Sequence, residues 1–193
     1  MKIALYLGSF NPFHNGHRDV ILKALKDFKM DRVIIVPSMQ NPWKKEKALD
    51  FDKRVEIICR SLDTIWFKDP KKNTKELSQL FNYISVENIE TKLIPPYYSY
   101  ATLHVLKNKY CNDEIFILCG MDTIKDIPNW MNGEAIIKDY NFLIVDRLSW
   151  DISSTQIREI LRTRHKMDAY YSDEKLARYV STNVINLLKK YYG

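Results

Sequence analysis

Apolar residues fall in short runs separated by amphipathic stretches, and this alternation predicts strands joined by helices. Residues 3–7, 33–36 and 115–119 are almost wholly apolar, which is typical of strands buried on both faces of a parallel sheet. From Ile21 to Phe28 apolar residues recur at helical spacing, so we expect a helix that turns Phe28 toward the core. Two further strands are expected, at residues 84–89 and 142–145. The pattern predicts an α/β fold, a Rossmann-like, doubly wound parallel sheet with C-terminal helices.

The length of 193 residues suits one domain, residues 1–193, because 46% hydrophobic residues can bury a substantial core. We expect residues 1–150 to form the α/β core and residues 151–193 to supply a second candidate motif and closing helices. The N-terminal apolar run is too short for a signal peptide and no run approaches a membrane span, which predicts a cytoplasmic protein. The three cysteines lack disulfide or zinc spacing and suit reduced thiols, with Cys59 and Cys119 as small core residues.

Residues 8–17, between the first strand and the first helix, hold the densest candidate chemistry. Gly8 and Gly16 have no side chain to hinder the approach of a phosphate to the main chain. His14 and His17 are three positions apart, so one face of the first helical turn can carry both imidazoles. The helix N-terminus adds unpaired N–H groups and a partial positive charge. The stretch therefore predicts a phosphate site.

Two other interpretations of these residues are open. The polar residues could merely cap the helix, although capping explains neither the glycines nor the paired histidines. The histidines could bind zinc, but no third ligand lies nearby in the sequence. The spacing also differs from the Walker lysine loop and from the G-x-G-x-x-G dinucleotide fingerprint.

A second candidate anion site lies at residues 152–158, where hydroxyl residues open an amphipathic helix. Ser153, Ser154 and Thr155 can hold phosphate oxygens together with the N–H groups of the helix start. Arg158 adds a planar cation with several donors. Taken alone, the run is equally well explained as a helix N-cap. Its occurrence together with residues 8–17 favours the phosphate interpretation.

Further candidates follow predicted strands, where open α/β sheets bind ligands. Lys44, in the loop after the second strand, is a candidate phosphate contact. Gly120 and Asp122 form a strand-to-helix turn whose carboxylate can bind ribose hydroxyls. Trp130 and the tyrosines within 97–100 offer flat faces to a planar ring, although the tyrosines could equally belong to the core.

Together these stretches resemble a known family. Residues 8–17, Gly-Ser-Phe-Asn-Pro-Phe-His-Asn-Gly-His, are similar to the G-x-F-x-P-x-H-x-G-H signature of the nucleotidylyltransferase superfamily. With residues 95–102, 120–122, 128–130 and 152–158, they resemble the pyridine-nucleotide adenylyltransferases, particularly the bacterial nicotinate-nucleotide adenylyltransferases. The resemblance covers most of residues 1–164.

The resemblance implies a role for each candidate. The catalytic groups, which would hold the ATP phosphates, would be His14, His17 and Arg158. The nucleotide site would be formed by Gly8, Ser9, Phe10, Gly16, Lys44, Gly120, Asp122, Ser153, Ser154 and Thr155. The acceptor would lie against Tyr98, Thr102 and Trp130, with the indole stacked on its pyridine ring.

The implied reaction transfers AMP from ATP to nicotinate mononucleotide, giving deamido-NAD and pyrophosphate. Mg²⁺ would accompany the ATP, with no metal held by the protein itself. The acceptor phosphate would attack the α-phosphorus, so the protein supplies positioning and charge rather than a nucleophile. Nicotinamide mononucleotide is an alternative acceptor, because the sequence does not show whether the site binds a carboxylate or an amide on the pyridine ring. Phosphopantetheine is a second alternative and matches the motifs less well. A nucleotide-sensing module is the alternative that is not an enzyme.

The charge balance suits phosphorylated small molecules. The chain has 30 basic and 24 acidic residues, a net charge of +6, which is modest for a nucleic-acid-binding protein. We expect neither a nucleic acid nor a membrane as partner, and a homo-oligomer stays open. Four features depart from the family pattern: Trp43 stands where a histidine is usual, residues 97–99 read Tyr-Tyr-Ser where Ser-Tyr-Thr is usual, residues 148–151 form a short connection, and residues 169–179 are an insertion.

Overall fold

The computed structural model describes residues 1–40, 48–63, 83–145, 152–166 and 169–193. The contacts within the chain divide it into two compact units. The first unit comprises Met1–Ser9, Val20–Lys47 and Phe81–Arg147, and the second comprises Phe10–Asp19, Ala48–Leu80 and Leu148–Gly193. The chain therefore passes between the units several times, first within the signature at residues 8–17.

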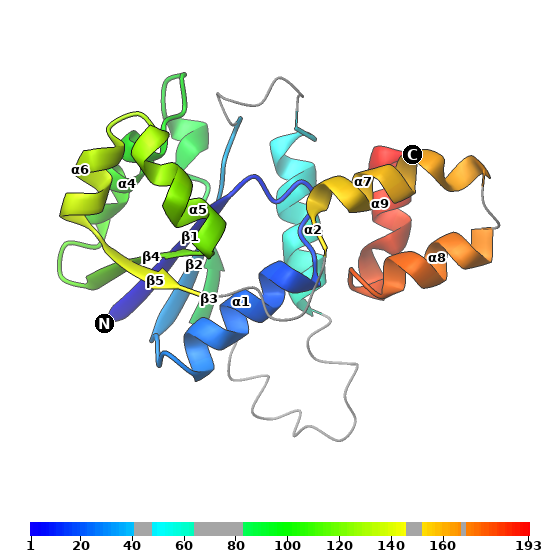
Figure 1. The fold of residues 1–193 in the computed structure, drawn as a ribbon, viewed down its shortest axis with the longest axis horizontal. Coiled ribbons are helices and arrows are strands. Elements are labelled where there is room, and N and C mark those ends of the chain that lie inside the picture. The colour runs from blue at the N-terminus through cyan, green and yellow to red at the C-terminus, as the bar shows by residue number, and fades with distance from the viewer. Residues whose placement is uncertain (41–47, 64–82, 146–151, 167–168) are drawn as a thin grey trace. The chain divides into compact units, whose positions relative to one another are not determined.

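The first unit is built on a parallel sheet, as the apolar runs predict (Figure 1). Its strands are β1 (Lys2–Gly8), β2 (Arg32–Pro37), β3 (Ile84–Val86), β4 (Glu114–Cys119) and β5 (Asn141–Ile144). They lie in the order β3-β2-β1-β4-β5, and Leu5 of β1 pairs with Ile34 of β2 on one side and Ile117 of β4 on the other. The order reverses at β1, so the carboxyl ends of β1 and β4 form the switch point where such sheets bind ligands.

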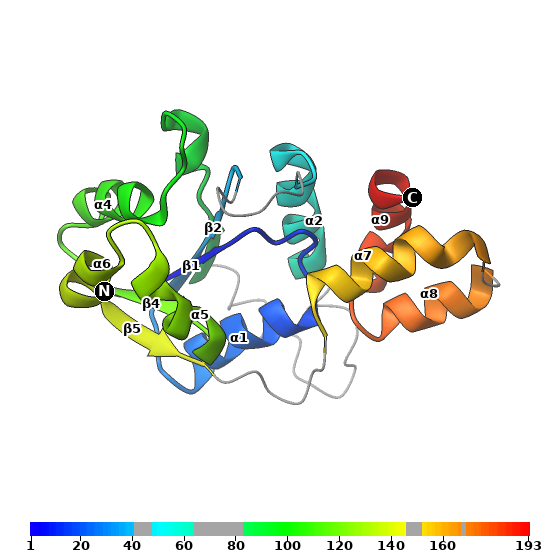
Figure 2. The same cartoon turned by 45° about the horizontal axis from the view of Figure 1, so that its top comes forward.

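Helices cover both faces of this sheet. The helices described in the first unit, with η marking a 3₁₀ helix, are α1 (Asn15–Lys26, from Val20 onward), η3 (Ile89–Lys92), α4 (Ser99–Lys109), α5 (Met121–Asp126), η4 (Ile127–Asn129) and α6 (Gly133–Asp139). Figures 1 and 2 show α1 on the side of the sheet opposite to α4 and α6. Ile3 and Leu5 of β1 pack in one buried cluster with Leu103 and Leu106 of α4 and Ile136 of α6. The doubly wound α/β fold is confirmed.

Two expectations for the core are wrong. Helix α1 ends at Lys26, and Lys29 has a positive φ of 54°, so Phe28 lies beyond the helix and is 39% exposed. Cys59 is exposed because Arg54, Ile57 and Ile58 supply the buried face of its helix instead. Cys119 is buried at the end of β4 as expected, and burial raises the pKa of its thiol to about 11.

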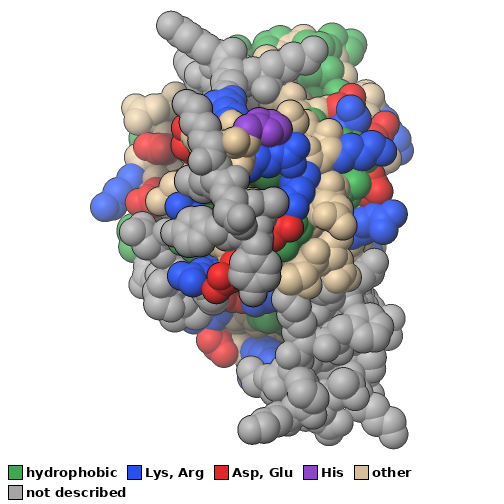
Figure 3. All heavy atoms as spheres, turned by 90° about the vertical axis from the view of Figure 1, so that its right-hand side faces the viewer, with side chains coloured by type: hydrophobic (Ala, Val, Ile, Leu, Met, Phe, Trp, Pro, Cys, Tyr) green, Lys and Arg blue, Asp and Glu red, His purple; other side chains and the backbone are tan. Residues whose placement is uncertain are grey.

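The second unit is helical in its described residues. Besides residues 15–19 at the start of α1, it contains α2 (Phe51–Asp63), α7 (Ser154–Thr163), η5 (Arg164–Lys166), α8 (Ala169–Ala177), η6 (Thr182–Val184) and α9 (Ile185–Tyr192). The buried apolar residues described on α7 to α9 are Ile157, Ile160, Leu161, Leu176, Ile185 and Leu188. Lys and Arg are interspersed with Asp and Glu on the face in Figure 3. No helix within the described ranges is long and apolar enough to cross a membrane.

Candidate active site

The two histidines of the signature lie against each other in the second unit. The ring centroids of His14 and His17 are 3.7 Å apart, with a 32° angle between the planes. Phe10 contacts the His17 ring edge-on at 5.1 Å, and Phe13 stacks on it at 5.4 Å. Phe10 and Phe13 are buried, so the imidazole of His17 has a fixed orientation. The spacing prediction that one turn brings both imidazoles together is confirmed.

A main-chain hydrogen bond sets the tautomer of His17. The N–H of His14 donates to Nδ1 of His17 over 3.2 Å. Because Nδ1 accepts this bond, the neutral ring carries its proton on Nε2. His17 therefore presents an N–H donor at its far nitrogen, which suits a phosphate oxygen.

Gly16 leaves room for the ring of His14. A Cβ at this position would lie 3.1 Å from both Cε1 and Nδ1 of His14. A side chain at position 16 would therefore push the imidazole out of place. The glycine therefore leaves space for the imidazole of His14, a reason that the sequence alone does not show.

The N–H groups at the start of α1 are less available than the sequence indicates. The N–H of Asn15 donates to the carbonyl of Tyr179 over 2.8 Å, and that of His17 donates to the carbonyl of His14 over 2.9 Å. The expectation of a row of unpaired donors is wrong at these two residues. The tight turn at His14 and the segment after α8 satisfy those donors, which leaves the side chains as the main candidates for holding an anion.

The hydroxyl residues at the start of α7 make three different contacts: a helix cap, a contact with the signature loop and a contact within the helix. Ser153 caps the helix: its hydroxyl accepts from the Gln156 N–H over 3.2 Å, while its own N–H donates to Gln156 Oε1 over 2.6 Å. The Ser154 hydroxyl donates to the carbonyl of Pro12 over 2.9 Å. Thr155 accepts from Arg158 over 3.3 Å. The capping alternative therefore holds for Ser153, whereas Ser154 joins α7 to the signature.

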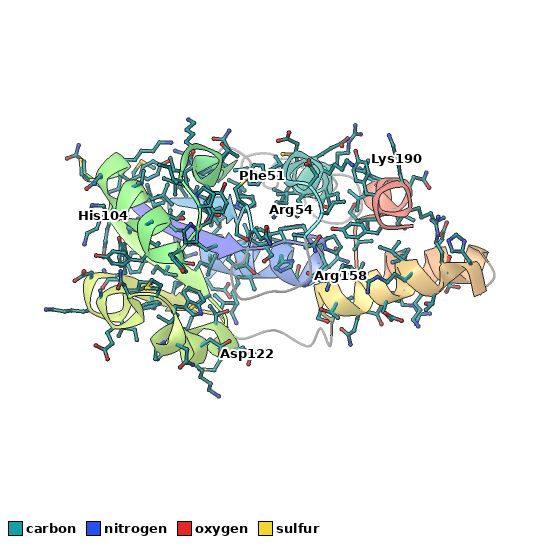
Figure 4. The ribbon with its side chains drawn as sticks, turned by 90° about the horizontal axis from the view of Figure 1, so that it is seen from above. Phe51, Arg54, His104, Asp122, Arg158 and Lys190 are labelled. Atoms are coloured by element: carbon teal, nitrogen blue, oxygen red, sulfur yellow. The ribbon has the colours of Figure 1, made fainter. Side chains whose placement is uncertain are left out.

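Asn11 connects the signature to three other parts of the second unit. Arg158 donates to the main-chain carbonyl of Asn11 over 2.8 Å. The Asn11 side-chain oxygen accepts from the Leu49 N–H over 3.2 Å and from the Tyr192 hydroxyl. Burial raises the pKa of Tyr192, although the nearby cations Arg54 and Arg158 oppose the rise. Figure 4 labels both arginines, on α2 and α7.

We expect Tyr192→Phe to lower kcat about fivefold, because it removes one net hydrogen bond from the loop that carries the histidines. Tyr191→Phe is the matched control, since Tyr191 donates to Glu56 over 2.6 Å instead of to Asn11. Steady-state rates and thermal unfolding of both variants check this. An equal loss of kcat in the two variants would show that the hydrogen bond from Tyr192 to Asn11 has no specific effect on kcat.

A cavity of about 320 Å³ opens in the first unit, and we call it the sheet-edge cavity. It lies at the carboxyl ends of β1 and β2, beside the start of α4 and the segment after β4. Its lining residues are Leu7, Gly8, Ser9, Val36, Ser38, Gln40, Glu90, Tyr97, Tyr98, Ser99, Thr123, Asp126, Trp130 and Met131. Hydroxyls, carboxylates and aromatic rings share this lining, so the cavity can take a flat polar ligand.

The cavity brings together some of the predicted residues of the first unit and not others. Gly8, Ser9, Tyr98 and Trp130 line it. Three other candidates do not line it: Thr102 is fully buried, Gly120 is the N-cap of α5, and Asp122 is exposed on that helix. Lys44 and Trp43 lie outside the described residues, as do residues 148–151.

Trp130 is held by a tight turn that includes Gly133. The N–H of Trp130 donates to the carbonyl of Ile127 over 2.9 Å, and that of Gly133 donates to the carbonyl of Trp130 over 3.0 Å. A Cβ on Gly133 would lie 1.9 Å from the Ile127 oxygen, so only glycine fits. Asn132 before it has φ of 56°. The Asn-Gly pair is the signal in the sequence that could have revealed this support.

Sequence reasoning also missed two acidic residues of the cavity. Asp126 lies at the end of α5, and Glu90 lies in η3, a segment with no recognisable motif. Neither belongs to an apolar run or to a glycine-rich turn. Within the described part of the chain, no three His, Cys, Asp or Glu side chains are grouped so as to hold a metal ion.

Known proteins share this sequence pattern and fold. A Fusobacterium nucleatum protein described as "probable nicotinate-nucleotide adenylyltransferase" is 29% identical over 100% of this chain and 99% of its own length. The nicotinate-nucleotide adenylyltransferase of Bacillus subtilis is 26% identical over 94% of this chain and 96% of its own.

A solved structure agrees on the fold. Plasmodium falciparum nicotinic acid mononucleotide adenylyltransferase complexed with NaAD superposes with a TM-score of 0.71 at 17% identity, covering 98% of this chain and 95% of its own. The cytidylyltransferase-like family matches residues 5–160, which include the signature, the second half of β1, the other four strands of the sheet and most of α7. The chain therefore belongs to the cytidylyltransferase-like family, and the resemblance seen in its motifs is confirmed.

Proposed function

We propose that this protein transfers AMP from MgATP to nicotinate mononucleotide, forming deamido-NAD and releasing pyrophosphate. The observation that carries the proposal is the pair of imidazoles 3.7 Å apart in a loop that Ser154 and Arg158 hold in place. The relatives that match nearly the whole chain bear the name of this enzyme. We place the reaction in the cytoplasm, with no nucleic acid or membrane as partner.

The chemistry is an in-line exchange at one phosphorus. A phosphate oxygen of the mononucleotide forms the new bond to the α-phosphorus of ATP, and the bond from that phosphorus to the bridging oxygen of pyrophosphate breaks. Nε2–H of His17 donates to a phosphate oxygen whose charge grows in the transition state. The imidazole of His14 lies beside it and can contact the same phosphate group.

In this proposal Arg158 and Ser154 support the signature loop and also lie at the site that binds the triphosphate. One guanidinium nitrogen of Arg158 holds the Asn11 carbonyl and another reaches Thr155, so the fork lies at the start of α7 beside the signature loop. A guanidinium has five N–H donors, enough to support the loop and to bind triphosphate oxygens as well. Arg158, the hydroxyl of Thr155 and the main-chain N–H of Ser154 at the start of α7 therefore form one side of the triphosphate site.

Magnesium enters with the nucleotide as part of the substrate. The described residues contain no cluster of ligands for a resident ion. Mg²⁺ is commonly bound through substrate phosphates rather than by a cage of protein ligands. When bound, the ion shares the neutralisation of the triphosphate charge. The protein's own cations then have to neutralise only part of that charge.

We assign the acceptor to the sheet-edge cavity, where Trp130 offers an indole face and Tyr98 a second aromatic wall. A pyridinium ring is flat and cationic, so it gains both stacking and cation–π attraction on such a surface. Nicotinamide mononucleotide is the second candidate acceptor, since it shares the ring and the phosphate. Gly120 and Asp122 stay predictions for the dinucleotide site, and Thr102 stays a prediction for the acceptor.

We expect Trp130→Ala to raise the KM for nicotinate mononucleotide several-fold, on the scale of about 0.5–2 kcal/mol for a cation–π contact. The KM for MgATP should change little, because the indole lies in the acceptor cavity. Trp130→Phe, which keeps a smaller ring, is the control and should fall between. A rise confined to the KM for MgATP would move Trp130 to the adenine side.

The direct test is the rate of pyrophosphate release from MgATP with each acceptor in turn. Nicotinate mononucleotide should give the highest kcat/KM, nicotinamide mononucleotide a lower one, and phosphopantetheine none above background. Binding of ATP without turnover of any acceptor would instead support the nucleotide-sensing module.

A further inference from the structure

A buried carboxylate that the proposed mechanism does not use lies in the wall of the sheet-edge cavity. Glu90 of η3 is 3% exposed and is one of the lining residues. Burying a carboxylate costs free energy unless its oxygens accept hydrogen bonds. The partners of Glu90 therefore indicate what its burial achieves.

The two oxygens of Glu90 bind two different walls of the cavity. Oε2 accepts from the main-chain N–H of Met39, in the loop after β2, over 2.7 Å. Oε1 accepts from the hydroxyl of Thr102, in the first turn of α4, over 2.9 Å. Thr102 is fully buried, so this bond is shielded from water. One side chain thus joins three segments: η3, the loop after β2 and the start of α4.

Both segments that Glu90 holds contribute residues to the cavity. Ser38 and Gln40, on either side of Met39, line it. At the start of α4, Tyr98 and Ser99 line it as well. The separation of these two walls is therefore linked to the reach of the Glu90 side chain.

We propose that Glu90 is a positioning residue for the acceptor: its carboxylate fixes the loop after β2 against the start of α4 and so sets the width of the site that takes the mononucleotide. The identity of that ligand rests on the proposed function. Thr102 acts in this arrangement through Glu90, since it does not line the cavity itself.

Glutamate suits this position better than aspartate or glutamine does. Met39 and Thr102 both donate hydrogen bonds, and an ionised carboxylate offers an acceptor oxygen to each of them. Such charge-assisted bonds are roughly twice as strong as neutral ones. Aspartate is one methylene shorter and cannot span the same distance, while glutamine has only one oxygen.

Thr102→Val tests the proposal with the least disturbance, because valine has nearly the shape of threonine and lacks only the hydroxyl. We expect the KM for nicotinate mononucleotide to rise about tenfold, the scale of removing one hydrogen bond to a buried carboxylate. The KM for MgATP should stay within about twofold, and kcat at saturation should change little. Thr102→Ser keeps the hydroxyl and should restore the normal KM.

A double-mutant cycle separates positioning from direct contact. If Thr102 acts through Glu90, then Glu90→Ala combined with Thr102→Val should be no worse than Glu90→Ala alone. If the rises in the acceptor KM caused by the two substitutions multiply in the double variant, the proposal is overturned, because Thr102 then touches the acceptor itself. An equal rise of both KM values would also overturn it, as a sign of general loosening. Should Glu90→Ala fail to fold, the valine and serine variants of Thr102 still decide.

The wild-type protein is measured first, so that the two proposals fail in different ways. If it uses nicotinamide mononucleotide rather than the acid, the variants are measured with that acceptor, and the expected split between acceptor and MgATP is unchanged. If it turns over while Thr102→Val keeps both KM values, only the role of Glu90 is refuted. If it uses no acceptor, the proposed function and the role of Glu90 fall together.

Discussion

Replacing His17 with alanine should lower kcat by on the order of 10²-fold or more, the loss seen when one preorganised donor to a developing charge is removed. The expectation rests on the fixed ring: Phe10 and Phe13 contact its edge and face, and the His14 N–H holds Nδ1. Because the donor is already oriented, the transition state gains its hydrogen bond without reorganisation. Steady-state kinetics with both substrates saturating measure the effect.

Two further replacements of His17 test which nitrogen matters. Glutamine can place an N–H near the position of Nε2, whereas asparagine can reach only the position of Nδ1, so the glutamine variant should retain more activity. His165→Ala is the matched control, since that histidine is exposed on η5 of the same unit. Near-normal turnover of a folded His17→Ala protein would remove His17 from the mechanism.

The second large effect is expected at Arg158. Arg158→Ala should reduce kcat/KM for MgATP by on the order of 10²–10³-fold, because it removes a charged donor to the triphosphate and the bond that holds the Asn11 carbonyl. Arg158→Lys keeps a charge but not the planar fork, so it should be impaired as well. Initial rates across a range of MgATP concentrations measure both variants.

A neighbouring arginine controls for charge and helix propensity. Arg162 lies one turn further along α7 and is exposed, so Arg162→Ala should leave kcat/KM for MgATP within about twofold. The loop contact and the triphosphate contact of Arg158 are separated by thermal unfolding, which reports only the former. Full activity of Arg158→Lys would show that a point charge suffices and that the fork is not used.

The predicted fold follows from patterns that depend on neighbours in sequence. Unbroken apolar runs identify β1, β2 and β4 because strands buried on both faces leave no position for a polar side chain. Helix ends are less predictable, and Phe28 shows why. The apolar spacing continues past Lys26, but the positive φ at Lys29 turns the chain away from the helix.

In the candidate site, too, features set by neighbours in sequence were predictable and features set by distant contacts were not. His14 lies just before α1 and His17 lies in its first turn, and this spacing of three residues brings their rings together. The reasons for Gly16 and Ser154 depend on atoms distant in sequence or on side-chain orientation, and no spacing reveals them. Glu90 is the clearest case: Met39 and Thr102, which donate to it, come from other segments, so only the three-dimensional structure shows its place in the cavity.

The central place of β1 in the sheet has a consequence for the nascent chain. β1 is synthesised first and gains β2 as a partner soon afterwards, but its other neighbour, β4, begins only at Glu114. At about 5–20 residues per second, the second edge of this apolar strand stays without β4 for on the order of ten seconds. Ribosome-bound chains that end before Glu114 should therefore need the protection of chaperones, and chains that extend past Cys119 should need it far less.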